Sequence, residues 1–135
     1  MKKINKKEFK KTLSKFSTGV TVIGIKSEEK IIGKTINSFT SLSLSPPLVL
    51  FTLDKKSSSL KNFKSSTYLS INILNKNQKN VSINFAKKNS KWGNIDFVEG
   101  EFKTPIIKKC LSNLECKVNK LIPQGDHIIF ICKVI

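Results

Sequence analysis

The stretch from Gly33 to Phe51 constrains the fold of this chain more than any other part of the sequence. From residue 35 to 44, apolar side chains are interleaved with small neutral polar ones, which are Thr35, Asn37, Ser38, Thr40, Ser41 and Ser43. A half-buried strand ordinarily carries charges on its wet face, whereas this segment offers only neutral hydrogen-bonding groups. Such a surface suits a polyol or a phosphate lying against a sheet. The Pro46–Pro47 pair then ends the segment, because proline lacks the donor that a central strand needs.

The sequence before this stretch predicts a helix and then a strand. Phe9, Leu13 and Phe16 recur at helical spacing with lysines between them, which indicates a short amphipathic helix. We expect its apolar stripe to lie across one mouth of a barrel. Because a strand and a charged turn follow the helix, the stretch from Gly33 is expected to form the second arm of a hairpin.

After residue 53, short strands and short helices follow one another. The serine-rich segment Asp54–Ser59 precedes a helical pattern, and this composition serves both helix capping and anion binding. The other expected elements are a strand at 67–74 with Asn72 inside it, a helix at 78–87 with Val81, Phe85 and Ala86 on one face, a surface excursion at 88–104 anchored by Trp92 and Phe97, and strands at 106–122 and 127–135. Together these elements predict one mainly β domain over residues 1–135, an antiparallel barrel with short peripheral helices.

The charge of the chain invites a nucleic-acid interpretation, which the composition weakens. The formal net charge is +16, and all 25 basic residues are lysines. Specific recognition of phosphates and bases favours the bidentate guanidinium group of arginine, which is absent here. The lysines are also scattered along the chain and do not form one block. A small basic nucleic-acid-binding barrel is therefore the least favoured interpretation, and the charge is expected to attract anionic cofactors.

The cysteines and the hydropathy pattern exclude several other classes. Cys110, Cys116 and Cys132 form no CxxC pair and have no histidine cluster beside them, so we expect no metal site and no disulfide framework. Free thiols are typical of a reducing compartment. No apolar region follows the basic start of the chain, and no run approaches the length of a membrane span. We expect a soluble cytoplasmic protein without a membrane partner.

Several motifs, in a fixed order and spacing, carry a resemblance to a known family. They are FSTGVTVI at 16–23, NSFTSLSLSPPLVL at 37–50, LDKKSSSL at 53–60, SINIL at 70–74, NFA at 84–86 and GDH at 125–127. Over nearly the whole chain, the sequence resembles the flavin reductase-like domain family, whose members are FMN-binding split β-barrels. Members of that family usually continue with a further strand and a tail, so the resemblance implies that this chain lacks the C-terminal strand and tail.

The scarcity of catalytic side chains in the sequence favours the same function. His127 is the only histidine, and the acidic residues show no pair placed to act as acid and base, so a hydrolase or a transferase has little support. Hydride transfer between a nicotinamide and a flavin needs no such group, because the cofactors supply the electronic chemistry. The resemblance implies an NAD(P)H-dependent flavin reductase that uses NADH or NADPH, reduces FMN or alternatively FAD, and supplies a separate oxygenase. The alternative is a flavin- or haem-binding split barrel without reductase turnover.

The resemblance also implies roles for particular residues. His127 would lie beside the nicotinamide, and a homodimer would place the flavin near its interface. The residues implied for cofactor binding are Thr35, Ile36, Asn37 and Ser38 along the flavin ring and ribityl chain, Ser41 toward the phosphate end, Asp54, Lys55, Ser57 and Ser59 at the phosphate, Phe85 and Ala86 closing over the flavin, and Lys88 near the phosphate. Phe39 is expected to belong to the core, and Asn72 to support a neighbouring strand.

Overall fold

A seven-stranded antiparallel sheet forms the body of the molecule in the computed structural model, which describes residues 3–135. Its strands are β1 (Thr21–Ser27), β2 (Lys30–Ile36), β3 (Thr40–Ser43), β4 (Leu48–Asp54), β5 (Tyr68–Ile73), β8 (Ser112–Gln124) and β9 (His127–Val134). They follow the order β2-β1-β5-β8-β9-β4-β3, so β2 and β3 are the two edges of the sheet although they are consecutive in the chain. The remaining elements are α1 (Lys6–Leu13), α2 (Leu60–Ser65), α3 (Lys79–Ala86) and the two-stranded sheet of β6 (Phe97–Glu99) and β7 (Pro105–Ile107).

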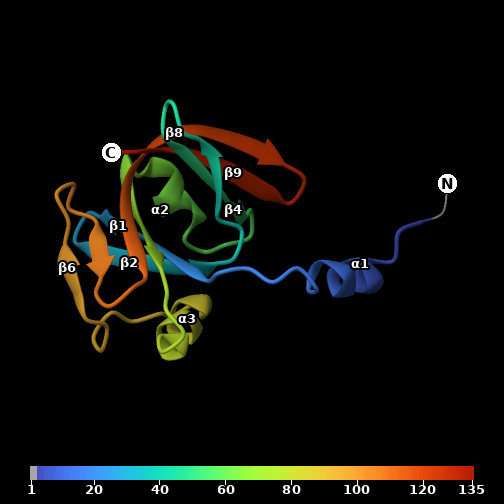
Figure 1. Cartoon of the computed structure of the whole chain (residues 1–135), viewed down its shortest axis with the longest axis horizontal. Helices are drawn as coiled ribbons and strands as arrows, with labels where there is room; N and C mark the ends of the chain where they lie inside the picture. The colour runs from blue at the N-terminus through green and yellow to red at the C-terminus, as the bar shows by residue number, and fades with distance from the viewer. Residues whose placement is uncertain (1–2) are drawn as a thin grey trace.

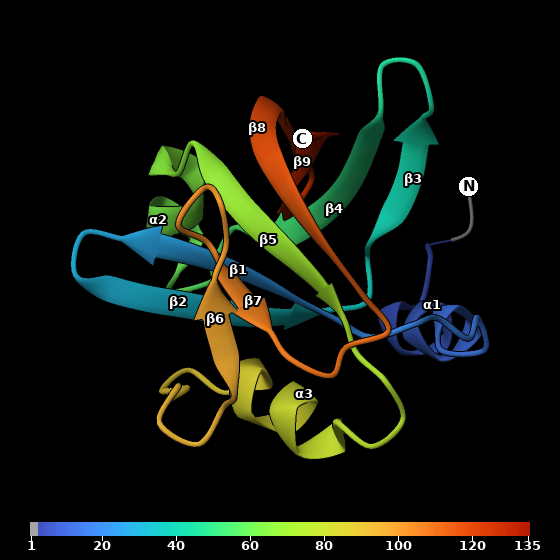
Figure 2. The same ribbon diagram turned by 60° about the vertical axis from the view of Figure 1, so that its left-hand side comes forward.

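The sheet curls on itself and encloses the larger hydrophobic core (Figures 1 and 2). Phe51 of β4 and Phe130 of β9 stack inside it with their ring centroids 4.9 Å apart, and both are fully buried. Phe63 of α2 enters the same core and is also fully buried. Because each aromatic ring buries a large apolar area, these side chains hold the curled sheet and α2 together. The predicted fold class, a mainly β antiparallel barrel with short helices, is confirmed.

A second, smaller core lies on the outer face of β1 and β2. It joins Val22 of β1, Val81 and Phe85 of α3, and Ile107 of β7, with Trp92 packed against it. Residues 21–25 of β1 are all buried, because this strand has the barrel core on one face and the second core on the other. The expected role of Trp92 as an anchor is confirmed, since its ring packs on Phe85 with the centroids 4.6 Å apart.

Asn72 connects three elements from inside the protein. Its side chain is fully buried in β5. The Nδ2 atom donates to the carbonyl oxygen of Val22 in β1 at 3.1 Å, and Oδ1 accepts from the backbone N–H of Ile107 in β7 at 2.9 Å. Buried polar groups need such partners, because an unpaired one carries the full cost of its desolvation. The prediction that Asn72 supports a neighbouring strand is confirmed.

Two predictions about the arrangement of the elements are wrong. Helix α1 stands away from the barrel (Figure 1) and buries no residue, so its stripe does not cross a barrel mouth; Phe9 remains 55% exposed and Leu13 57%. The strand expected at 106–122 is two strands, β7 and β8, which belong to different sheets. Between them the backbone of Lys109 adopts a φ of 62°, in the left-handed region that interrupts extended structure.

Candidate functional site

The two edges of the sheet meet at a seam next to Ser38, and the candidate site is built around this seam. Residues 37–39 carry the chain from the end of β2 to the start of β3. There, Ser38 Oγ accepts from the backbone N–H of Thr52 at 3.0 Å and donates to the carbonyl oxygen of the same residue at 3.1 Å. These bonds fix the connection on β4. The stretch from Gly33, which was expected to form one arm of a hairpin, is therefore divided into the end of β2, this connection and β3. Phe39 packs against the barrel core, as predicted.

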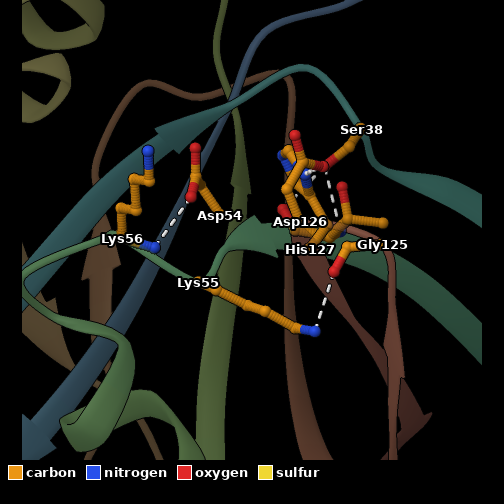
Figure 3. Close-up of polar contacts among 8 residues, drawn as sticks. Ser38, Asp54, Lys55, Lys56, Gly125, Asp126 and His127 are labelled. Carbon is orange, nitrogen blue, oxygen red and sulfur yellow. Dashed lines mark hydrogen bonds and ion pairs between the residues drawn. The ribbon is translucent and has the colours of Figure 1, made fainter.

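The loop after β4 is folded by its own aspartate (Figure 3). Asp54 Oδ1 accepts from the backbone N–H of Lys56 at 2.7 Å, and the carbonyl oxygen of Asp54 accepts from the N–H of Ser57 at 2.9 Å. An Asp side chain that bonds the backbone two residues further on forms an Asx turn, a common device for tight loops. The Asp54 carboxylate therefore shapes the loop, and its negative charge makes it a poor partner for the phosphate that the sequence assigned to it.

The serines of this loop present hydroxyl groups beside an open cavity. Ser57 Oγ and Ser59 Oγ lie 3.2 Å apart, and Ser59 precedes α2 without using its side chain to cap the helix. The cavity has a volume of about 520 Å³ and is lined by Lys55, Ser57, Ser58, Leu60, Lys61, Lys64 and Ser65. Hydroxyl donors surrounded by ammonium groups suit a phosphate. The sequence predicted the two serines; the contribution of Lys61 and Lys64 becomes visible only when α2 turns them toward the same cavity.

His127 lies next to this loop, because β9 pairs with β4. Asp54, the last residue of β4, is the cross-strand partner of His127, the first residue of β9. The imidazole Nδ1 lies 2.7 Å from Asp126 Oδ1, and this hydrogen bond lowers the pKa of the Asp126 carboxyl below its usual value. Sequence reasoning named Asp126 only as part of the GDH motif and did not assign it a contact with the imidazole. The adjacency of the two residues in the GDH motif was the available signal.

Lys55 reaches across to the same turn (Figure 3). Its Nζ atom donates to the carbonyl oxygen of Gly125 at 2.8 Å, and its backbone N–H donates to the carbonyl oxygen of Asp126 at 2.9 Å. Lys55, which was predicted to bind the phosphate, thus donates one of its three ammonium protons to a backbone carbonyl oxygen. Gly125 itself has a φ of +55°, which a residue without a Cβ adopts without strain. The loop after β4 and the β8–β9 turn therefore form one connected unit.

The predicted residues near α3 are arranged differently. Thr35 Oγ1 donates to the carbonyl oxygen of Ser82 in α3 at 2.7 Å, and Ile36 belongs to the barrel core. Phe85 is fully buried beneath Gly33, where even a Cβ would come within 2.6 Å of its ring. The Phe85 side chain therefore packs in the core instead of closing over a ligand. Asn37, Ser41, Ala86 and Lys88 are exposed, and their contacts with a ligand stay predictions.

The arrangement at the seam fits a flavin with a phosphate tail. The Ser38 connection, the Ser57–Ser59 loop and the His127 turn come together at the ends of β2, β4 and β9, whereas Thr35 and Phe85 are engaged with α3 and the second core. Serine hydroxyl groups that do not cap the helix, beside a lysine-lined cavity, match the chemistry of the phosphate end.

Within residues 3–135, no group of three His, Cys, Asp or Glu side chains could hold a metal ion. No helix of that same range has the length and apolar character needed to cross a bilayer.

Comparison with known proteins identifies the family. The model of the flavin reductase like domain matches residues 13–135. An FMN reductase (NADH), SmoA, from Agrobacterium fabrum is 34% identical over 131 residues, which are 97% of this chain and 75% of that protein. The reductase component of a flavin-dependent trigonelline monooxygenase from Acinetobacter baylyi is 35% identical, and the match covers 99% of this chain but only 44% of the relative.

The solved structures agree with this assignment. The NADH:FAD oxidoreductase SgcE6 from Streptomyces globisporus superposes with a TM-score of 0.90 at 31% sequence identity, over all of this chain and 84% of that one. The chain belongs to the flavin reductase like domain family.

Proposed function

We propose that this chain is an NAD(P)H-dependent flavin reductase that transfers a hydride from NADH or NADPH to FMN, or alternatively to FAD, and passes the reduced flavin to a separate oxygenase. The family match over residues 13–135 is the observation that carries the proposal. The relatives support the cofactors, since they are named as NADH-dependent reductases of FMN and of FAD. The cavity lined by lysines and serines supplies a place for the phosphate end that FMN and FAD share.

The residues at the seam would bind and orient the reactants. Hydride transfer needs no acid, base or nucleophile from the protein, because the cofactors supply the electronic chemistry. The bound flavin supplies the electron-accepting chemistry. Ser57 and Ser59 would donate hydrogen bonds to its phosphate end, with Lys61 and Lys64 adding positive charge. His127 would orient the nicotinamide beside the seam. Because reactants held in contact in the right orientation react far faster than free ones, positioning alone supplies a large part of the rate.

The decisive experiment is an anaerobic reduction. Purified protein is mixed with FMN or FAD under argon, NADH or NADPH is added, and the loss of the visible absorbance of the oxidised flavin is followed, with protein-free mixtures as controls. We expect rapid bleaching that depends on the protein, and colour that returns when air is admitted. Tight flavin binding without bleaching by either nicotinamide would contradict the reductase and would favour the alternative, a flavin-binding barrel without turnover.

We also propose that two copies form a homodimer through α1. The apolar stripe of α1 and the turn after it has no partner among residues 3–135, and Phe9, Leu13 and Phe16 are 55%, 57% and 80% exposed. Exposed apolar groups of this kind are typical of surfaces that another molecule covers, and closed symmetric dimers are the commonest assembly of soluble proteins.

Light scattering at micromolar concentration tests the dimer. The parent protein is expected at twice the mass of one chain, and the double variant Phe9→Ser and Leu13→Ser at the mass of one chain. The matched control is Thr12→Ser, an exposed position of the same helix. A parent protein that is strictly monomeric while it binds flavin tightly would overturn the proposal.

The relatives also support the remaining partner, and the cofactors and cysteines support a cytoplasmic location. Two of them are named as reductase components of flavin-dependent monooxygenases, which supports an oxygenase as the recipient of the reduced flavin. We place the protein in the cytoplasm, where nicotinamide cofactors are available and where its three free cysteines would stay reduced. Co-purification with a tagged oxygenase encoded nearby, and fractionation of the source cells, would check these two points.

A further inference from the structure

The pairing of His127 with Asp126 determines which nitrogen of the imidazole carries the proton. A carboxylate only accepts hydrogen bonds, so the nitrogen 2.7 Å from Asp126 Oδ1 must be the protonated one. That nitrogen is Nδ1. A neutral imidazole has one proton, and its Nε2 is therefore left as an acceptor. The side chains of His127 and Asp126 are 43% and 88% exposed, and within residues 3–135 Nε2 of the imidazole makes no hydrogen bond, so it is available to a ligand.

The turn that carries this pair is itself attached to the loop after β4. Lys55 contributes both of the bonds, one from Nζ to Gly125 and one from its backbone N–H to Asp126. The strand register adds a further constraint, because His127 lies opposite Asp54 on β4 and opposite Gln124 on β8. The imidazole is thus held at a fixed place relative to the serines of the candidate phosphate site.

The other charged groups near the ring do not compete for Nδ1. The carboxylate of Asp54 bonds the backbone N–H of Lys56, and the ammonium of Lys55 bonds a carbonyl oxygen. Lys6 of α1 is close enough to act on Asp126 electrostatically, and its positive charge favours the ionised carboxylate. Asp126 is therefore the group that sets the tautomer of His127.

We propose that Asp126 is a positioning residue that keeps His127 in the Nδ1–H tautomer, so that Nε2 accepts a hydrogen bond from the carboxamide N–H of the nicotinamide. The proposal rests on the proposed function for the identity of the ligand, but not for the tautomer. A ring protonated at Nε2 would offer a donor instead, which pairs with the carboxamide oxygen. The carboxamide would then have to rotate by half a turn, and Asp126 thereby selects the orientation in which the nicotinamide docks.

Nitrogen NMR reads the tautomer directly, because the chain has a single histidine. Uniformly ¹⁵N-labelled protein at about pH 8, well above the ordinary pKa of histidine, is recorded with long-range ¹H–¹⁵N correlation, without any nicotinamide. We expect a protonated Nδ1 and an unprotonated Nε2 in the parent protein. In Asp126→Ala we expect the populations to shift toward Nε2–H. The control is Asp96→Ala, which removes an equal charge from an exposed residue whose recorded ion pair is with Lys108. An unchanged tautomer in Asp126→Ala would overturn the proposal.

Kinetics then tests whether the tautomer matters for docking. In Asp126→Ala we expect kcat/KM for NADH to fall by about three- to tenfold, which corresponds to the loss of one hydrogen bond of ordinary strength, with the flavin Kd and the control Asp96→Ala unchanged. A changed tautomer with unchanged kcat/KM would overturn the link to the nicotinamide. If the parent protein shows the expected tautomer but never oxidises NADH, the proposed function fails while the assignment of the tautomer holds.

Discussion

At the scale of single residues, the serines of the loop after β4 offer the most direct test of the site. Replacing Ser57 and Ser59 together by Ala removes two hydroxyl donors beside the lysine-lined cavity. Each charge-assisted hydrogen bond to a phosphate contributes roughly 1–2 kcal/mol, so we expect at least about a tenfold weaker flavin affinity. Fluorescence titration with FMN gives the affinity, and urea denaturation should show little change in the free energy of unfolding.

The control for this variant removes a serine hydroxyl that does not line this cavity. Ser66 bonds the carbonyl oxygen of Tyr68 at the other end of α2. Ser66→Ala is expected to leave the flavin affinity unchanged. Unchanged affinity in the Ser57 and Ser59 double variant as well would place the phosphate elsewhere.

The three cysteines should differ in reactivity according to their burial. Cys116 and Cys132 are fully buried, and desolvation raises the pKa of each thiol to about 12. Only the thiolate reacts with disulfide reagents, so both should resist Ellman's reagent at pH 8 in the folded protein. Cys110, which is partly exposed, should react. We expect one thiol per chain to titrate natively and three in urea; rapid native titration of all three would show that the barrel core opens easily.

How far the sequence could predict single residues depends on what determines their position. Asn72 was identifiable because an amide inside an apolar strand needs buried partners. The burial of Phe85 was missed, because a helix with one apolar face does not reveal what that face covers; the contact surface is Gly33, 52 residues earlier in the chain. The contact between Lys55 and Gly125 was missed for the same reason, since only the pairing of β4 with β9 brings them together.

At the scale of elements, a carboxylate from another strand holds the turn of the β6–β7 hairpin. Glu115 of β8 accepts from the backbone N–H groups of Glu101 and Phe102 at 2.9 and 3.1 Å, and from Thr104 Oγ1 at 2.6 Å. In Glu115→Ala we expect a loss of about 1–3 kcal/mol of stability, because three donors lose a charged acceptor. Faster amide hydrogen exchange at Glu101 and Phe102 would localise the effect to this hairpin.

The matched control is Glu101→Ala, which removes an exposed carboxylate from the same hairpin turn. It is expected to change the free energy of unfolding by less than about 0.5 kcal/mol, as surface substitutions usually do. Equal losses in the two variants would mean that Glu115 acts only through its charge.

The elements themselves were easier to predict than their partners. Apolar alternation and turn residues located β5, β9 and α3 to within a few residues, because these patterns depend on local periodicity. The break between β7 and β8 depends on Lys109 entering the left-handed region, which lysine rarely favours, and no turn residue marks it. The position of α1 could not be predicted either, since its apolar stripe packs against no other part of the chain that the structure describes.

At the scale of the whole molecule, the net charge of +16 should act on anionic ligands. Positive charge raises the local concentration of an anion, and dissolved salt screens this attraction. We expect the Kd for FMN, measured by fluorescence quenching, to rise severalfold between about 20 mM and 500 mM NaCl. Riboflavin, which lacks the phosphate, is the matched control and should show almost no dependence on salt. Equal salt dependence for both ligands would mean that the lysines do not attract the phosphate.

The seam between β2 and β3 has a consequence for the lifetime of the protein in the cell. Residues 37–39 carry the chain across this gap, and Ser38 is bonded there to β4. A ligand that contacted both β2 and β3 at the seam would close the ring, and a ligand present at one hundred times its Kd adds about 2.7 kcal/mol to the free energy of unfolding. The protein without ligand would then open more often and would be cut sooner by proteases. Degradation would then remove the copies that find no flavin, and the abundance of the protein would follow the supply of its cofactor.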